Sequence, residues 1–196
     1  MKNAKKVLVL LLCAVILIGA SIAGTVAYLT DSDNVVTNTF TVGKVEITMV
    51  ETKVDLYGVA LTGDDAGTND GNKYKLIPGH TYTKDPTITV GANSEDCYIL
   101  VKIANGLGTD AELNMSDSWA KVSETGNESV WVYGTADDPT SVSANGTVTP
   151  FDNFTFGTEA DPTEYEEAEI IVTGYAIQAD GLDAKTAAEL WTLLNQ

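Results

Sequence analysis

The segment from residue 97 to residue 103 constrains the fold of this chain more than any other. Two sets of side chains alternate along it: Cys97, Ile99, Val101 and Ile103 on one face, and Tyr98, Leu100 and Lys102 on the other. This period of two predicts a β-strand, because successive side chains of a strand point to opposite faces. Both faces are largely apolar, so we expect the strand to lie in the middle of a sheet.

Further segments predict strands: the alternating run 45–49 and the β-branched or aromatic runs 87–90, 130–133, 151–156 and 169–177. Turn-forming residues separate them, among them Pro78-Gly79, Asn145-Gly146, the stretch 137–139 and the Gly, Asp and Asn-rich loop 63–72. Short strands divided by turns predict an all-β fold. We expect a jelly-roll or Ig-like antiparallel β-sandwich.

One segment near the C-terminus has a helical pattern instead. Ala187, Leu190, Trp191 and Leu194 follow the i, i+3, i+4, i+7 spacing of an amphipathic helix. Asp183 is a plausible N-cap. We therefore expect a short C-terminal helix that lies on the sandwich, with Trp191 packed into a core.

The first 27 residues have the layout of a secretory signal. Lys2, Lys5 and Lys6 precede the apolar run 7–22, and small residues follow it. Thr25 and Ala27 suit the −3 and −1 positions, so cleavage is expected between Ala27 and Tyr28. The alternative is a retained membrane anchor, although a run of about 16 residues is short for a spanning helix. The expected organisation is a signal peptide, 1–27, and one β-sandwich domain, 28–196.

Charge and cysteine content exclude several classes of protein. The formal net charge is −17, all eleven basic residues are lysine, and loss of the leader's three lysines brings the charge to −20. Such a chain repels phosphate backbones, so we expect no nucleic-acid partner, and contact with a membrane only through an uncleaved signal. Cys13 lies in the leader, which leaves Cys97 as the mature chain's one cysteine, expected to be buried.

Catalytic and metal-binding motifs are scarce, so no catalytic residue and no cofactor is assigned. His80 is the only histidine, whereas a zinc site usually needs two or three His or Cys ligands. A polar turn residue explains His80 equally. Asp64, Asp65 and Asp70 crowd one loop and are candidate calcium ligands, but they lack the EF-hand order, and a solvated turn accounts for them too.

Several ordered blocks of the sequence resemble the TasA/camelysin family of exported proteins from Gram-positive bacteria. The blocks are GTVAYLTD at 24–31, NTFTVG at 38–43, Pro78-Gly79, KDPTITV at 84–90, Cys97-Tyr98-Ile99 and GYAIQADGL at 174–182. The family commonly has Phe where this chain has Leu29. The resemblance implies that a SipW-type signal peptidase removes the leader and that the mature protein is secreted to the cell surface or extracellular space.

The resemblance also implies a structural role in the biofilm matrix. Family members form fibres in which the N-terminal segment of one subunit completes the sheet of the next, so this chain is expected to associate with itself or with a related matrix protein. Residues 28–40 would supply the strand, with these side chains in contact: Tyr28, Leu29, Val35, Val36 and Phe40. The alternative is that 28–40 forms the first strand of its own sandwich.

Two other functions stay open at this point. Some family members are described as metallo-endopeptidases, a function that would require an unusual site in a chain with one histidine. A surface adhesin is the other alternative. In that case the loop 63–72 would be the first place to look for ligand contacts.

Overall fold

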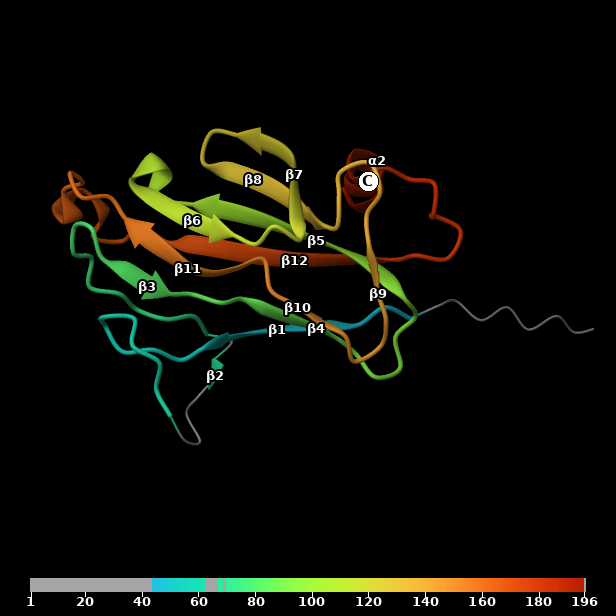
Figure 1. Cartoon of the computed structure of the whole chain (residues 1–196), viewed down its shortest axis with the longest axis horizontal. Coiled ribbons are helices and arrows are strands. Elements are labelled where there is room, and N and C mark those ends of the chain that lie inside the picture. Colours follow the sequence, from blue (N-terminus) through green and yellow to red (C-terminus); the bar gives the residue numbers. More distant parts are fainter. Residues whose placement is uncertain (1–43, 63–66, 69, 196) are drawn as a thin grey trace, which may run out of the picture. The chain divides into compact units, whose positions relative to one another are not determined.

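The computed structural model describes residues 44–62, 67–68 and 70–195, all of which belong to one compact unit. The predictions for residues 1–43 lie outside these residues. Strands dominate, every strand pairing is antiparallel, and one α-helix lies close to the C-terminal end of the described chain (Figure 1). No helix among the described residues has the length and hydrophobicity needed to cross a membrane.

One layer of the fold is built from two short sheets. The first has the order β10-β4-β1-β2, with β10 (Thr147–Val148), β4 (Thr87–Val90), β1 (Ile47–Thr52) and β2 (Gly67–Thr68). The second has the order β3-β11-β6, with β3 (Thr81–Thr83), β11 (Phe151–Phe156) and β6 (Ala111–Met115). Because β3 precedes β4 and β10 precedes β11 along the chain, the two short sheets continue one another.

The other layer is a five-stranded sheet around β5 (Cys97–Asn105). Its other members are β12 (Ile170–Gln178), β8 (Glu128–Tyr133), β7 (Trp119–Thr125) and β9 (Ser141–Val142). β5 pairs with β12 along one edge and with β8 and β9 along the other. The central position predicted for this strand is therefore confirmed.

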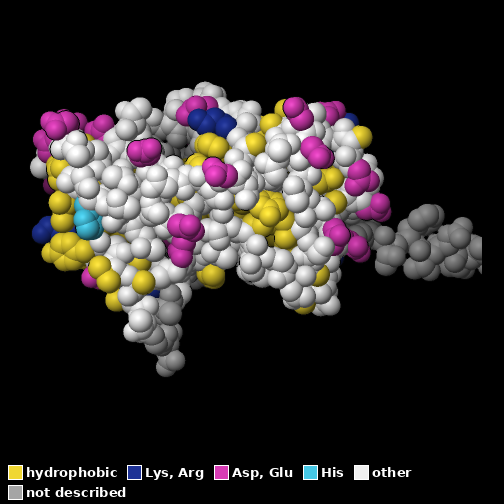
Figure 2. All heavy atoms as spheres, viewed as in Figure 1, with side chains coloured by type: hydrophobic (Ala, Val, Ile, Leu, Met, Phe, Trp, Pro, Cys, Tyr) yellow, Lys and Arg dark blue, Asp and Glu magenta, His cyan; other side chains and the backbone are white. Residues whose placement is uncertain are grey.

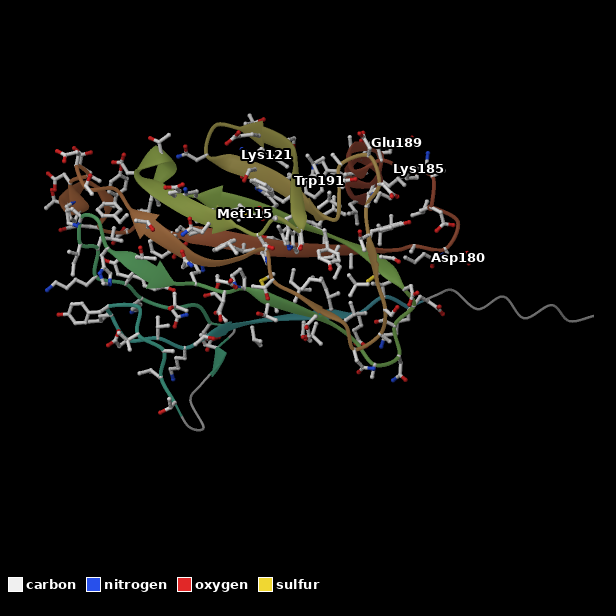
Figure 3. All side chains as sticks on the ribbon, in the orientation of Figure 1. Met115, Lys121, Asp180, Lys185, Glu189 and Trp191 are labelled. Carbon is white, nitrogen blue, oxygen red and sulfur yellow. The ribbon has the colours of Figure 1, made fainter. Side chains whose placement is uncertain are left out.

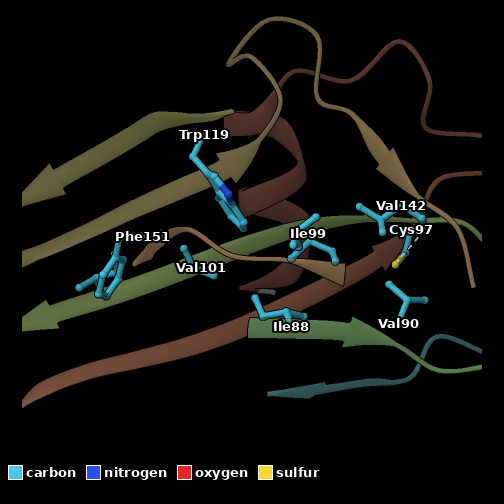
Figure 4. Close-up of a cluster of buried hydrophobic side chains, with 10 residues drawn as sticks. Ile88, Val90, Cys97, Ile99, Val101, Trp119, Val142 and Phe151 are labelled. Carbon is cyan, nitrogen blue, oxygen red and sulfur yellow. Dashed lines mark hydrogen bonds between the residues drawn. The ribbon is translucent and has the colours of Figure 1, made fainter. Parts of the chain in front are cut away.

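The main hydrophobic core lies between the two layers (Figure 4). β5 contributes Cys97, Ile99, Val101 and Ile103, which are the odd-numbered residues of the alternating run. The facing layer contributes Ile88, Val90, Val148 and Phe151. The even-numbered residues Tyr98 and Leu100 enter a second core on the opposite face of the sheet. Both faces of β5 are apolar because both are covered.

The helix α2 (Ala187–Leu194) covers that opposite face, as Figure 3 shows for Trp191. Ala187 and Leu190 are fully buried, and the Trp191 ring meets the Tyr175 ring edge-on at 5.0 Å. The predicted helix and its apolar face are confirmed, but the predicted N-cap, Asp183, is wrong. Thr186 caps the helix because Glu189 stands three residues later and completes a capping box. Asp183 lies beside Tyr98 instead.

A third core closes the end of the sandwich where β3 and β6 lie. Tyr82, Phe154 and Phe156 are its large buried rings, and the Tyr82 and Phe154 rings stack at 5.0 Å. Two short 3₁₀ turns border it, η1 (Gly108–Asp110) and η2 (Pro162–Tyr165). Each aromatic pair adds about 0.5–1.5 kcal/mol beyond the burial of its area, which makes this end rigid.

The turns predicted at Pro78-Gly79, 137–139 and Asn145-Gly146 also form. Gly79 has φ +73° and Asn145 has φ +62°, a conformation that glycine and asparagine tolerate better than other residues. All the predicted strands are present within a few residues of the expected ends. Six others were not predicted, namely β2, β3, β6, β7, β9 and β10, and β2 lies inside the segment 63–72 that was expected to be a loop. The expected all-β antiparallel sandwich with a short C-terminal helix is confirmed.

Candidate functional site

A groove of about 1220 Å³ runs between β1 and β12 on the described fold. Ile47 and Met49 line it from one layer, and the segment 170–174 lines it from the other. The segments 70–74 and 165–169 line one end. The groove thus lies between an edge of one layer and an edge of the other layer of the sandwich.

Each wall of the groove is a strand with an open edge. β12 pairs with β5 on one side, and within the described chain no strand pairs with its other side. β1 pairs with β4, and β2 covers the far side of β1 only at Glu51 and Thr52. An open edge presents unpaired N–H and C=O groups, which are a template for another strand.

The middle of the groove is apolar. Ile47, Met49, Ile170 and Val172 are partly buried and pack against the main core. On the rim, Val50 and Ile171 keep 47% and 51% of their surface exposed, values that are high for large aliphatic side chains in strands. These side chains would leave water if an extended segment with apolar residues filled the groove.

Gly174 leaves room on β12 for side chains of β1, because glycine has no side chain of its own. A Cβ atom built at Gly174 would lie 3.1 Å from Met49 Cε and 3.3 Å from Ile47 Cδ1. The space that a side chain would occupy on β12 is therefore filled by the ends of two flexible side chains from β1. Methionine adapts its shape readily, so Met49 can move when the groove is filled.

A buried polar cluster lies at the end lined by the segment 70–74. Lys84 Nζ and Glu51 Oε1 lie 2.6 Å apart, with 7% and 11% of their side chains exposed. The Asn72 amide donates to the Thr52 carbonyl at 2.9 Å, and its oxygen accepts from the Val54 N–H at 3.0 Å. Within the described residues, no buried side-chain N or O atom lacks a partner. The cluster is thus a satisfied network that holds the loop 70–74 against β1.

Tyr74 lies in the same cluster and donates its hydroxyl to the Thr83 carbonyl at 2.8 Å. Burial, and then the charge of Glu51, raise the pKa of Tyr74 above its ordinary value of 10.0. The phenol therefore stays neutral at physiological pH. Its role here is that of a hydrogen-bond donor and a packing group between the groove and the third core.

Acidic residues line the rim at this end. Glu166, Glu167 and Glu169 are exposed and border the groove. The η2 turn that precedes them is held by two hydrogen bonds: Asp161 accepts from the Thr163 N–H at 2.9 Å, and Tyr165 donates to Asp110 at 2.9 Å. An occupant that enters at this end passes a negatively charged border.

The residues predicted from the sequence fall mostly elsewhere. The cleavage residues Thr25, Ala27 and Tyr28 lie outside the described residues, as do the assembly-strand residues Leu29, Val35, Val36 and Phe40 and the calcium candidates Asp64 and Asp65. Asp70 is described and lies at the polar end of the groove, exposed. Across residues 44–62, 67–68 and 70–195, no three His, Cys, Asp or Glu side chains are placed to hold a metal ion.

His80 and Cys97 are held by packing and hydrogen-bond contacts within the fold. His80 Nε2 lies 2.9 Å from the Tyr57 carbonyl, and the imidazole meets the Tyr82 ring edge-on at 4.5 Å. Cys97 is fully buried in the main core, where burial, and to a smaller extent the charge of Asp96, raise its pKa to about 11. Such a thiol is unreactive at neutral pH.

The groove itself was not predicted, although its parts are visible in the sequence. The signal was the strand 169–177 with apolar residues at Ile170, Ile171 and Val172, a run that one buried face does not explain. Comparisons with protein-family models, with curated proteins and with solved structures found no match.

Proposed function

We propose that this protein is an exported structural subunit of an extracellular, biofilm-type matrix, and that it assembles into fibres by strand addition. In this proposal a SipW-type signal peptidase cuts between Ala27 and Tyr28. The freed segment 28–40 of one copy then enters the groove between β1 and β12 of the next copy. The single observation that carries the proposal is the groove with an open strand edge on each wall.

The chemistry of the groove and of the segment agree. Val35, Val36 and Phe40 offer apolar side chains to the apolar middle of the groove, and Thr and Asn residues lie between them. An extended chain spans at most about 3.3–3.6 Å per residue, so residues 28–40 reach roughly 45 Å. That length exceeds what β12 or β1 needs for full pairing, since neither strand has more than nine residues.

The energetic argument rests on the backbone. A strand inserted between two open edges gains hydrogen bonds on both sides, which satisfies N–H and C=O groups that otherwise face water. Burial of Val50 and Ile171 adds a hydrophobic contribution of about 25 cal/mol per Å². A contact between two different surfaces does not close on itself, so repetition yields filaments.

The test compares two recombinant forms by negative-stain electron microscopy, one that begins at Tyr28 and one that begins at Thr41. The first is expected to form filaments, and the second is expected to stay folded and monomeric. A synthetic peptide of residues 28–43 should bind the second form. If both forms stay monomeric and the peptide does not bind, the proposal is wrong, and screening for adhesin ligands becomes the next step.

A groove variant provides the matched control. In Ile171→Asp, a charge stands on the open edge of β12, where the side chain is already exposed, so the fold should persist. We expect this variant to lose peptide binding. Leu193→Asp places the same charge on an exposed leucine of α2 that does not line the groove, and this variant should bind the peptide as the unmodified protein does.

A further inference from the structure

Five of the eight large hydrophobic residues that are exposed on the described fold lie in two neighbouring loops. We name this set the loop patch: Leu56, Tyr57, Val59, Leu61 and Ile77. Their exposed fractions run from 37% for Ile77 to 62% for Val59. In Figure 2 hydrophobic side chains surround the single histidine at this end of the fold. A contiguous exposed apolar patch of this kind often marks an interaction site, whereas scattered exposed apolar residues do not.

Hydrogen bonds hold the two loops of the patch in place. The Lys75 N–H donates to the Leu56 carbonyl at 2.8 Å, which ties the two loops together. Tyr82 fixes the second loop, because its hydroxyl accepts from the Ile77 N–H and donates to the Lys75 carbonyl, both at 2.7 Å. Gly58 has φ +78°, and a Cβ there would lie 2.9 Å from Tyr82 Cα. The loops therefore hold their side chains outward on a rigid base.

The two loops of the patch carry a local charge opposite to that of the whole chain, whereas the exposed Glu166 and Glu167 border the groove at the same end. The segments 53–61 and 73–80 hold three lysines and one aspartate, in a chain of net charge −17. The aspartate, Asp55, is used within its own turn, where it accepts from the N–H groups of Tyr57 and Val59. Lys75 Nζ lies 5.8 Å from the centre of the Tyr57 ring, so a positive charge stands over the patch.

The opposite end of the fold is acidic. The Lys44 carbonyl accepts from the Glu95 N–H at 3.1 Å, and the Ala179 N–H donates to the Asp96 carbonyl at 2.8 Å, which places the start of the described chain beside the loops 91–96 and 179–183. Exposed carboxylates surround this place: Glu95, Asp96, Asp137, Asp138, Asp180 and Asp183. Asp180 is labelled there in Figure 3.

The groove runs from the acidic end of the fold to the end that carries the loop patch. Ile47 and Gly174 meet near the end where β1 begins, whereas Asn72, Tyr74 and Leu76 lie at the end beside the loop patch. A segment 28–40 that enters from the loop-patch end brings Lys44 of its own copy to that end. The acidic end of the donor copy then faces the loop patch of the acceptor copy. The inserted segment runs parallel to β1 and antiparallel to β12.

We infer that the loop patch is a second contact between successive copies of this chain, and that it receives the acidic end of the copy whose N-terminal segment fills the groove. Lys73 and Lys75 lie opposite carboxylates in this contact, while Leu56, Val59 and Ile77 lose contact with water. The inference rests on the proposed function. It adds that strand insertion leaves the angle between neighbouring copies free, and that the end-to-end contact fixes this angle and lowers the protein concentration needed for filaments.

The test uses the chain from Tyr28 to Gln196, which keeps every described residue. The double variant Leu56→Asp/Val59→Asp removes the apolar character of the loop patch at its two most exposed aliphatic side chains. The matched control is Leu193→Asp, which places the same charge on an exposed leucine of α2. Assembly is followed by sedimentation and electron microscopy, and folding by circular dichroism and melting temperature.

A second measurement separates the two proposals. The same substitutions are made in the form that begins at Thr41, and binding of the 28–43 peptide is measured. Among the described residues the core clusters begin at Val45, so this form keeps all of their described members. We expect the loop-patch variant to bind the peptide unchanged, and to raise the protein concentration needed for filaments at least about tenfold. The control variant should assemble as the unmodified protein does.

The other outcomes overturn the inference in distinguishable ways. Filaments of the loop-patch variant at the usual concentration exclude the end-to-end contact and leave strand insertion standing. Loss of peptide binding in that variant shows that the patch acts through the groove. Normal assembly combined with lost binding to phosphatidylglycerol vesicles identifies the patch as a lipid contact. Absence of both peptide binding and filaments in the unmodified protein overturns the proposed function as well.

Discussion

Glu51 on β1 and Lys84 between β3 and β4 form an ion pair of 2.6 Å at the polar end of the groove, with 11% and 7% of their side chains exposed. The other ion pairs of the described residues are much more exposed, as in the Lys44–Glu46 pair at 66% and 58%. A buried pair adds little net stability over apolar residues, but loss of one partner leaves a charge without compensation. The pair therefore fixes the geometry of the groove end.

The first prediction follows from this pair. Glu51→Ala should lower the free energy of unfolding by about 3–5 kcal/mol, because Lys84 would stay buried without its partner. The double variant Glu51→Ala/Lys84→Met should recover part of the loss. Urea unfolding followed by tryptophan fluorescence measures both. Glu46→Ala is the matched control on an exposed pair and should leave unfolding unchanged within error; equal losses in both single variants would contradict the prediction.

The second prediction concerns the base of the loop patch. Tyr82→Phe should lower the free energy of unfolding by about 1–3 kcal/mol, because the Ile77 N–H and the Lys75 carbonyl both lose their partner. Tyr57→Phe is the matched control, since the Tyr57 side chain is 47% exposed. Urea titration of the two variants side by side tests this. A Tyr82→Phe protein as stable as the control would mean that water replaces both hydrogen bonds.

The strands with alternating or β-branched patterns were predictable because their burial follows directly from the pattern. β6 was not, since Ala111–Met115 reads AELNM, in which Ala, Glu, Leu and Met are good helix formers. This segment forms a strand because it pairs with β11, which lies far along the chain. β7 lies at a sheet edge and is largely exposed beyond its first residues, so it carries a weak hydrophobic signal.

The N-cap of α2 could have been identified from the sequence, but it was assigned to the wrong residue. Asp183 and Thr186 both precede the apolar face, but only Thr186 has a glutamate three residues later. The groove could not be read from the sequence in the same way. Its walls come from the first and the last described strands, and its existence depends on which strand edges lack a neighbour.

The third prediction concerns the capping box. Thr186→Ala should lower stability by about 0.5–2 kcal/mol, since the Glu189 N–H loses its acceptor. Hydrogen bonds from Thr186 and Lys185 also lower the pKa of Glu189 below its ordinary value of 4.5. Its contribution is therefore complete above pH 4.5 and is lost as pH falls through the lowered pKa.

The pH dependence separates Glu189 from the many other carboxylates. In Glu189→Gln, the stability difference from the unmodified protein should shrink as pH falls below 4.5, because the unmodified protein loses the same contribution. Urea unfolding at a series of pH values, followed by tryptophan fluorescence, measures the difference. A difference that stays constant across this range would show that the Glu189 charge does not support the helix.

The last prediction uses Cys97, which is the only cysteine in a chain that begins at Tyr28. Its thiol is fully buried and has a pKa raised to about 11. A thiol reagent at pH 8 should therefore modify the native protein only as fast as it unfolds, and the urea-unfolded protein at once. The Glu51→Ala variant should react faster than the unmodified protein, because it unfolds more readily.

Alkaline pH tests the same thiol with the opposite sign from Glu189. The unfolded chain releases the Cys97 proton near pH 9.0, whereas the folded chain holds it to about 11, so this group destabilises the fold as pH rises between the two values. Cys97→Ala should flatten that part of the stability curve. Prompt modification of the native protein at pH 8 would contradict both expectations, because it would require the space between β5 and β9 to open without unfolding.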